Sequence, residues 1–382
     1  MMASQVERRN PNSTMFNRDA VKHLLQFRCV ANFWNSLMFF ARKHFKRNPN
    51  IINLSPILPF DLITEILSRV PVKLLLQFRC VCKSWNSLIS HDPNFAKKHF
   101  KMSTTPNLHV ISYDDPSKRP FEHYLHYIVG SCDGILCLAD FHNSFVVLWN
   151  PSIRKFKELP PFEKPQVAGS AKFGFGYDHL SHSYKVVVLY NSYRCDIIED
   201  TIKIKIYNLR TNSWRSFQKL PFTTEFGSDQ SGVYVSGTIN WLASTKWLPP
   251  LFIVSFDLGK DSYKKIFPPE HAEFDGRSKL CVLKDCLCII CDYDIWIMKE
   301  YGIKESWTKL FKLSNLPGQR KGIWRSYLTK ALDIFEDDQV LLVERWNKKL
   351  IVYDFKNDTF KVTSLFPTLP EICTESLISP CS

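Results

Sequence analysis

Four cysteines lie close together in the second half of the chain, at Cys281, Cys286, Cys288 and Cys291. Thiolates are good zinc ligands, and structural zinc sites commonly use two separated C-x2-C pairs. Here the spacing is C-x4-C-x-C-x2-C, and on a β-strand Cys286 and Cys288 would point to the same face. We therefore interpret these thiols as small apolar residues of buried strands, and we expect no metal site.

Two histidines, His179 and His182, lie close together in the run DHLSH, but the spacing suggests no third metal ligand. We interpret both as surface residues of a turn.

Carboxylates are the remaining candidates for chemistry. A hydrolase built from β-strands would need several of them converging on a central channel, and the nearest candidates are Asp133, Asp178, Asp257 and Asp354. Three of the four occupy repeated turn contexts, which favours capping of the turn backbone. The sequence contains no GxSxG, HExxH, GxxxxGK[ST] or GxGxxG motif. We expect no catalytic residue and no cofactor.

Length and charge bound the remaining classes. At 382 residues, with 45% hydrophobic and 23% charged residues, the chain has the composition of a globular protein with two or three domains. The net charge is +13, but residues 1–110 contain 16 Lys and Arg against 5 Asp and Glu. The remainder is nearly neutral, which argues against nucleic acid as a partner of the main body.

The N-terminal region indicates the compartment. The first 20 residues are polar and lack the apolar core of a signal peptide. The longest uncharged N-terminal run, residues 29–41, is 13 residues long, whereas crossing a bilayer takes about 20. We therefore expect an intracellular protein of the cytoplasm or nucleus, without membrane contact, whose 12 cysteines are reduced.

Residues 56–101 predict short helices, because prolines at 59, 71 and 93 divide a run with apolar residues at helical spacing. We expect three helices. A unit of about 45 residues buries only a modest core, so some apolar side chains should remain exposed as a partner site. That patch would contain Leu58, Pro59, Ile66, Val70 and Pro71. Alternatively, these side chains bury against the C-terminal domain.

The run LPFDLITEILSRVP (58–71), followed by RCVCKSW (79–85), closely resembles the F-box of plant F-box proteins. The resemblance implies docking onto a Skp1-like adaptor and, through it, onto the cullin of a ubiquitin ligase. By position, the adaptor-facing residues of the family correspond to Leu58, Pro59, Ile66, Leu67, Val70, Pro71, Val81 and Trp85. Val81 and Trp85 are expected to belong partly to the core.

A partial duplicate precedes this F-box. Residues 21–37 match residues 72–88 at 13 of 17 positions, but the copy lacks the LPxDLxxEIL helix and is not expected to fold as a second F-box. We predict five segments: a disordered N-terminus (1–20), the duplicate (21–50), the F-box (51–101), a linker or first strand (102–120) and a β domain (121–382).

The β domain contains a recurring pattern: aromatic, Asn or Asp, three variable residues, Asn or Asp, Ser or Thr, aromatic. It occurs at 207–214, 256–263 and 353–360, more loosely at 149–156 and divergently at 295–307. The pattern predicts a hairpin whose turn side chains bond their own backbone while the flanking aromatic residues pack across the strands. Spacing near 50 residues predicts five or six blades of a β-propeller, with a β-sandwich as the alternative. The fold class is therefore α+β and multidomain.

Further stretches resemble the F-box-associated domain of the same plant family, among them GSCDGILCLAD (130–140) and GVYVSGTINWLA (232–243). One departure is His182, where the related turn of the family more often has an acidic residue. Because the chain contains no Gly-Gly pair, the kelch signature proper is missing. The resemblance implies a non-catalytic, substrate-recognition subunit of an SCF-type ubiquitin ligase, whose β domain captures a target protein. Trp241, Trp247 and Trp324 are candidate anchors, with core packing as the alternative. A scaffold outside any ligase and a propeller hydrolase are the rival functions.

Overall fold

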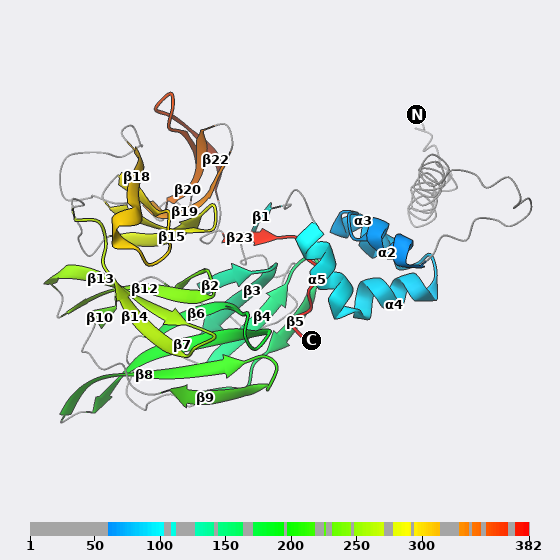
Figure 1. Cartoon of the computed structure of the whole chain (residues 1–382), viewed down its shortest axis with the longest axis horizontal. Coiled ribbons are helices and arrows are strands. Elements are labelled where there is room, and N and C mark those ends of the chain that lie inside the picture. Colours follow the sequence, from blue (N-terminus) through cyan, green and yellow to red (C-terminus); the bar gives the residue numbers. More distant parts are fainter. Residues whose placement is uncertain are drawn as a thin grey trace, which may run out of the picture. The chain divides into compact units, whose positions relative to one another are not determined.

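A computed structural model describes residues 60–102, 108–111, 127–140, 144–162, 171–194, 197–217, 225–226, 231–245, 248–270, 278–291, 294–313, 328–335, 338–344, 349–365 and 371–381 (Figure 1). The chain divides into two compact units, residues 1–103 and 104–382, and each is described by itself. The predicted disordered N-terminus and partial duplicate, together with Leu58 and Pro59, lie outside the described residues.

The first unit contains four described helices: α2 (Phe60–Leu67), α3 (Val72–Phe78), α4 (Lys83–His91) and α5 (Pro93–Met102). As the sequence predicts, Pro71 separates α2 from α3 and Pro93 begins α5 after α4, whereas no proline lies between α3 and α4. The segment after α4 adds one helix to the expected three. The Asp92 side chain accepts the N–H groups of Asn94 at 2.8 Å and Phe95 at 3.1 Å, which caps the start of α5. Pro93 is tolerated there because its missing N–H would have no partner inside the helix.

The core of this helical unit is small. Phe78 and Trp85 pack with ring centroids 5.8 Å apart, and both are buried. The Glu65 carboxylate links α2 to α5 through Lys98 at 2.6 Å and also pairs with Arg69 at 2.8 Å. Over residues 60–102, the other buried hydrophobic residues are Leu67, Val70, Val72, Leu75, Leu88, Ile89, Phe95 and Ala96.

The second unit is a β-propeller of five antiparallel blades, so the sandwich alternative is wrong. Blade one consists of β2 (Tyr127–Cys132), β3 (Ile135–Asp140), β4 (Phe145–Asn150) and β5 (Lys155–Glu158). Blade two consists of β6 (Ala171–Asp178), β7 (Ser183–Arg194), β8 (Ile197–Asn208) and β9 (Ser213–Phe217). Each strand pairs with the next in sequence, which is why consecutive hairpins are enough to build a blade.

Blade three departs from this plan at its first strand. Two short pieces, β10 (Glu225–Phe226) and β11 (Val233–Val235), pair with different parts of β12 (Thr238–Thr245). β13 (Leu248–Asp257) and β14 (Ser262–Ile266) complete the blade. The first strand position is thus shared by two segments of the chain.

The last two blades return to the simple order. Blade four consists of β15 (Lys279–Leu283), β16 (Cys286–Cys291), β17 (Asp294–Met298) and β18 (Trp307–Lys312), with the short 3-10 helix η2 (Lys304–Ser306) before β18. Blade five consists of β19 (Leu328–Ile334), β20 (Gln339–Glu344), β21 (Lys349–Asp354) and β22 (Thr359–Leu365).

The two ends of the second unit close the propeller. β1 (Leu108–Ile111) pairs with β23 (Glu371–Thr374). β23 is tied to blade one by the Ser131 hydroxyl, which donates to the Ile372 carbonyl at 2.7 Å, and to blade five by the Lys330–Glu371 ion pair at 2.6 Å. The strand that precedes blade one and the strand that follows blade five are therefore held together between those two blades.

The recurring eight-residue pattern forms the hairpins that the sequence predicts. Its aromatic ends are paired across the strands: Trp149 with Phe156, Tyr207 with Trp214, Phe256 with Tyr263 and Tyr353 with Phe360. In each turn the second residue is Asn or Asp and accepts backbone N–H groups from within the turn; Asn208, for example, accepts from Arg210 at 2.9 Å. The sixth residue has positive φ in all four turns, near 50°.

Adjacent blades pack through apolar faces, and blades two and three approach very closely. A Cβ atom on Gly176 of β6 would lie 2.1 Å from the Tyr234 ring, and one on Gly174 would lie 2.4 Å from Ile239. Alternate glycines on one face of β6 therefore let blade three approach, while Phe173 and Phe175 are buried. This explains the FGFGYD run of β6.

Candidate functional site

The helical unit exposes large apolar side chains. Phe60 is 48% exposed, and Leu74 and Val81 are each 36% exposed. Pro71 is also exposed and lies one helical turn before Leu74, whose N–H donates to the Pro71 carbonyl at 3.0 Å. The exposed apolar side chains of the helical unit thus include Phe60, Pro71, Leu74 and Val81. Within residues 60–102, these are apolar side chains that a partner can reach without disturbing the core.

Several other predicted docking residues lie deeper. Leu67, Val70 and Trp85 are buried in the core of the helical unit itself, at 1%, 8% and 5% exposure, and Ile66 is half-buried. The Trp85 ring packs on Phe78 of α3. Phe60 and Leu74, in contrast, were not among the predicted residues. Three consecutive leucines at 74–76 were the available signal, since a helix cannot turn all three toward one core.

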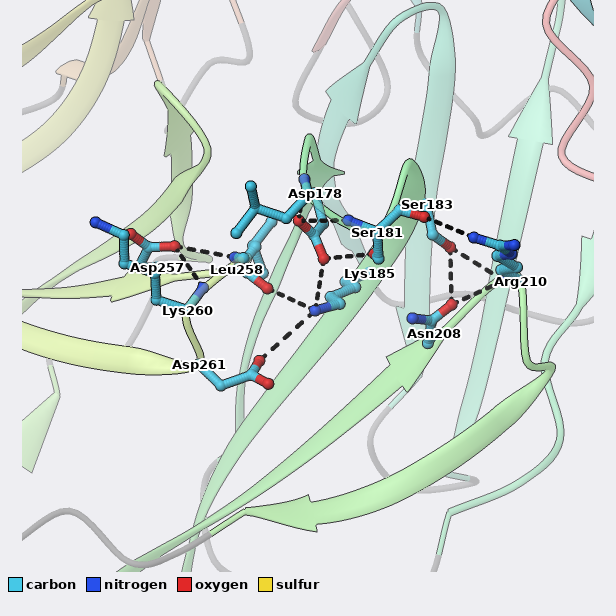
Figure 2. A network of polar contacts seen from close by, with 12 residues as sticks. Asp178, Ser181, Ser183, Lys185, Asn208, Arg210, Asp257, Leu258, Lys260 and Asp261 are labelled. Carbon is cyan, nitrogen blue, oxygen red and sulfur yellow. Dashed lines mark hydrogen bonds and ion pairs between the residues drawn. The ribbon is translucent and has the colours of Figure 1, made fainter.

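In the propeller, turns of blades two and three meet in a polar network (Figure 2). The turn between β6 and β7 begins at Asp178, whose carboxylate accepts the backbone N–H of Leu180 at 2.8 Å and the hydroxyl of Ser181 at 2.5 Å. In the neighbouring β8–β9 turn, Asn208 accepts the hydroxyl of Ser183 at 2.8 Å. Two turns of blade two are thereby fixed to each other.

A buried lysine connects this network to blade three. The Lys185 ammonium lies 2.8 Å from the Asp178 carboxylate, donates to the Leu258 carbonyl at 2.5 Å and lies 3.6 Å from Asp261. The side chains of Lys185 and Asp178 are only 6% and 2% exposed. Arg215 pairs with the same Asp261 oxygen, Oδ1, at 2.5 Å. Charge pairing therefore joins blade two to the β13–β14 turn.

The acidity of Asp178 follows from these contacts. Burial by itself raises the pKa of this carboxyl group, but the hydrogen bond from Lys185 and those from the Ser181 hydroxyl and the Leu180 and Ser181 N–H groups lower it to about 2. Asp178 therefore remains ionised and bonded within the turn over the physiological pH range.

The comparisons with known proteins identify both units. The family model described as "F-box associated beta propeller domain" matches residues 87–365, and the F-box domain model matches residues 56–97. The chain belongs to the F-box protein family. Among Arabidopsis thaliana proteins, it is 30% identical over 347 residues to "F-box/kelch-repeat protein At3g23880", covering 79% of this chain and 89% of that protein.

Two further Arabidopsis relatives give the same result. "F-box protein At3g07870" is 28% identical, with 82% of this chain and 88% of the relative covered. "F-box protein CPR1" is 27% identical, with 78% and 82% covered. Both matches span most of this chain and most of the relative.

The candidate anchor Trp241 of this F-box protein lies in the propeller core. It is 2% exposed, and its indole N–H donates to the Phe173 carbonyl of blade two at 3.2 Å. These contacts are those of the core-packing alternative. Trp247 and Trp324 lie outside the described residues, and their role as anchors stays a prediction.

The four aspartates considered for hydrolysis are engaged in turn contacts. Asp178, Asp257 and Asp354 each accept N–H groups from their own turns, as the capping interpretation predicts. The Asp133 carboxylate accepts the hydroxyl of Tyr184, 2.8 Å away, so it links blade one to blade two. Burial is the first cause of the raised pKa of Tyr184, and the nearby Asp133 adds to it. All four carboxylates thus have structural partners.

The cysteines and histidines are placed as their interpretation predicts. Cys281 pairs with Cys288 across β15 and β16, both are fully buried, Cys291 is buried and Cys286 is half-buried. The hydrogen bond with Cys281, followed by burial, raises the pKa of Cys288 well above its usual value. His179 and His182 are exposed in the β6–β7 turn. Across the described ranges, no group of three or more His, Cys, Asp or Glu residues is arranged to hold a metal ion.

Membrane spanning can be assessed for the described helices. The longest of them, α5, has 10 residues, and none of the helices in the described ranges is long and apolar enough to cross a bilayer.

Proposed function

We propose that this F-box protein is the substrate-recognition subunit of an SCF-type ubiquitin ligase. Its F-box docks onto a Skp1-like adaptor and through it onto a cullin, and its propeller captures a target protein for ubiquitination. The observation that carries the proposal is the F-box match at residues 56–97, which falls on a helical unit with exposed apolar side chains. The protein acts inside the cell, in the cytoplasm or nucleus.

The mechanism in this proposal is proximity. Binding the target on one unit and the adaptor on the other places an acceptor lysine near the ubiquitin thioester of the charged enzyme. The effective concentration of that thioester rises without any acid or base supplied by this chain. Family members are adaptor subunits, and this role requires binding surfaces rather than a catalytic constellation.

The docking residues proposed from the sequence divide into two groups. Pro71 and Val81 are exposed and suited to contact the adaptor directly, as are Phe60 and Leu74. Leu67, Val70 and Trp85 are buried, so we expect them to act by maintaining the shape of the unit. Leu58, Pro59 and Ile66 complete the proposed docking set.

Co-purification with a Skp1-like adaptor tests the docking step. The full chain is expected to retain the adaptor, and a Leu58→Ala, Pro59→Ala double variant is expected to lose most of it. Ile303→Ala, at an exposed apolar residue of the propeller, is the matched control and should retain it. Equal retention by wild type and the double variant would show that the docking assignment is wrong.

The two rival functions predict different results. A binding scaffold outside the ligase would not co-purify with the adaptor at all. A propeller hydrolase would turn over a glycosidic or ester substrate without any partner, and substitution of Asp133 or Asp178 would abolish turnover. Neither rival has a specific observation in its favour.

A further inference from the structure

The turn between β6 and β7 is longer than the corresponding turns of blades one, three and four. β6 pairs with β7 from Asp178 to Ser183, which leaves four residues in the turn. The first turns of blades one, three and four contain only two residues each: Asp133 and Gly134, Ser236 and Gly237, Lys284 and Asp285. The extra length projects Leu180 from the blade, and at 70% it is the most exposed large hydrophobic side chain in the described ranges.

The turn that carries Leu180 is fixed by polar contacts. The Asp178 carboxylate accepts the backbone N–H groups of Leu180 and Ser181, and it also pairs with the buried Lys185 ammonium. Blade three also contacts this turn: Gly259 lies so close to Leu180 that a Cβ atom on it would be 2.8 Å from the Leu180 side chain. A side chain presented by a fixed turn loses little backbone freedom when a partner covers it.

Figure 2 shows Asp178 and Lys185 in the middle of the polar network, between Lys260 at one end and Arg210 at the other. The carboxylates are used within the structure: Asp178 pairs with Lys185, Asp257 accepts N–H groups of its own turn, and Asp261 pairs with Lys185 and Arg215. Two cationic side chains are exposed beside them. Arg210 lies on one side, donating to the Ser181 carbonyl at 3.3 Å, and Lys260 follows Gly259 on the other.

We infer that Leu180, Arg210 and Lys260 form a binding surface, the three-turn surface, for an acidic segment of the target protein that carries an apolar residue. The apolar residue packs on Leu180, and flanking Asp or Glu side chains pair with Arg210 and Lys260. Exposed cations around an apolar centre complement such a segment in both charge and polarity. The inference rests on the proposed function and adds to it the chemistry of the target segment that the propeller binds.

Peptide binding to the purified full chain tests this inference. The probe is a pool of short fluorescent peptides with a leucine flanked by Asp or Glu and all other positions varied. A second pool has Lys or Arg in place of the acids, and a single-stranded RNA pool tests the other class of partner. We expect binding of the acidic pool, measured by fluorescence anisotropy, and weaker binding as salt increases.

Variants locate the binding. Leu180→Ala and Lys260→Glu should each weaken binding of the acidic pool by about tenfold or more, because truncating a central contact or reversing a facing charge has effects of this size. The matched controls are Ile303→Ala, exposed on blade four, and Lys356→Glu, in the equivalent turn of blade five. Both should bind like wild type.

Co-purification with the adaptor separates the two proposals. All four variants should retain the adaptor, so its loss from the wild-type chain would refute the proposed function without touching the three-turn surface. The surface itself is refuted if the acidic pool does not bind, if Leu180→Ala and Lys260→Glu bind like wild type, or if the basic or RNA pool binds more tightly than the acidic one.

Discussion

The helical unit and the propeller differ in how they cover apolar surface. In the helical unit, four short helices enclose a small core and leave Phe60, Leu74 and Val81 exposed. In the propeller, neighbouring blades share apolar clusters, such as the one that Val187 and Ile204 of blade two form with Trp241 and Phe256 of blade three. The difference teaches that the small helical unit keeps apolar side chains exposed because it is too small to bury all of them.

The two units also use charge differently. In the helical unit the Glu65 pairs with Arg69 and Lys98 are on the surface, where such pairs contribute little. In the propeller the Lys185–Asp178 pair is almost fully buried, so removing one partner leaves a charge without compensation. Substitutions in the two units should therefore have effects of different size and kind.

The largest loss of stability is expected from Phe78→Ala in the helical unit. Phe78 is 1% exposed and packs on Trp85, so truncating its side chain should lower the free energy of unfolding by about 3–5 kcal/mol. This is a large share of the total free energy of unfolding of so small a unit. Hydrogen exchange read by mass spectrometry should show loss of protection over residues 60–102 alone. Unchanged protection there would mean that the core is assigned wrongly.

A slightly smaller loss, about 3 kcal/mol, is expected from Lys185→Met in the propeller, because the buried Asp178 carboxylate loses its partner. Denaturant unfolding of the propeller measures it. Lys260→Met, at an exposed lysine nearby, is the control and should change the free energy of unfolding by less than about 0.5 kcal/mol. Similar values for the two variants would contradict the role given to the buried pair.

Acid should weaken the propeller through Asp178. The pKa of this group is lowered to about 2 in the folded protein, below the ordinary value of 3.8, so its contribution is complete above about pH 4 and is lost as pH falls toward 2. The loss should amount to about 1–2 kcal/mol. In thermal unfolding scans Asp178→Asn should show a shallower fall over this range than wild type, and identical slopes would count against the lowered pKa.

The smallest change in stability is expected from Leu74→Ser. Because Leu74 is exposed, the free energy of unfolding should change by less than about 0.5 kcal/mol, whereas adaptor affinity should fall by about tenfold. Denaturant unfolding and calorimetric titration with the adaptor measure the two quantities. A variant that keeps full affinity would remove Leu74 from the docking surface.

Local chemistry explains what the sequence could predict of this fold. The aromatic and Asn or Asp positions of the hairpins act within eight residues, so pairs such as Tyr207 with Trp214 follow from the pattern itself. The divided first strand of blade three has no such local pattern, because β10 and β11 pair with separate parts of β12. Spacing alone therefore left the choice between five and six blades open.

The sequence could predict the elements that carry the candidate site residues, but not contacts that depend on how several elements pack together. The apolar spacing of 60–70 indicates a helix but cannot show that Leu67 faces the core while Phe60 faces outward, since that depends on how α3, α4 and α5 pack. The contact between Lys185 and Asp261 joins positions 76 residues apart, and it arises only when blades two and three assemble. The packing of blade three against blade two also brings Gly259 next to the Leu180 side chain.

Hydrogen exchange of the full chain with and without a Skp1-like adaptor tests the central claim most directly, because one measurement compares the two units. The account predicts that the adaptor slows exchange in the helical unit, around Phe60, Pro71, Leu74 and Val81, and leaves the propeller blades unchanged. Slowed exchange confined to the blades, or none in the helical unit at saturating adaptor, would contradict it.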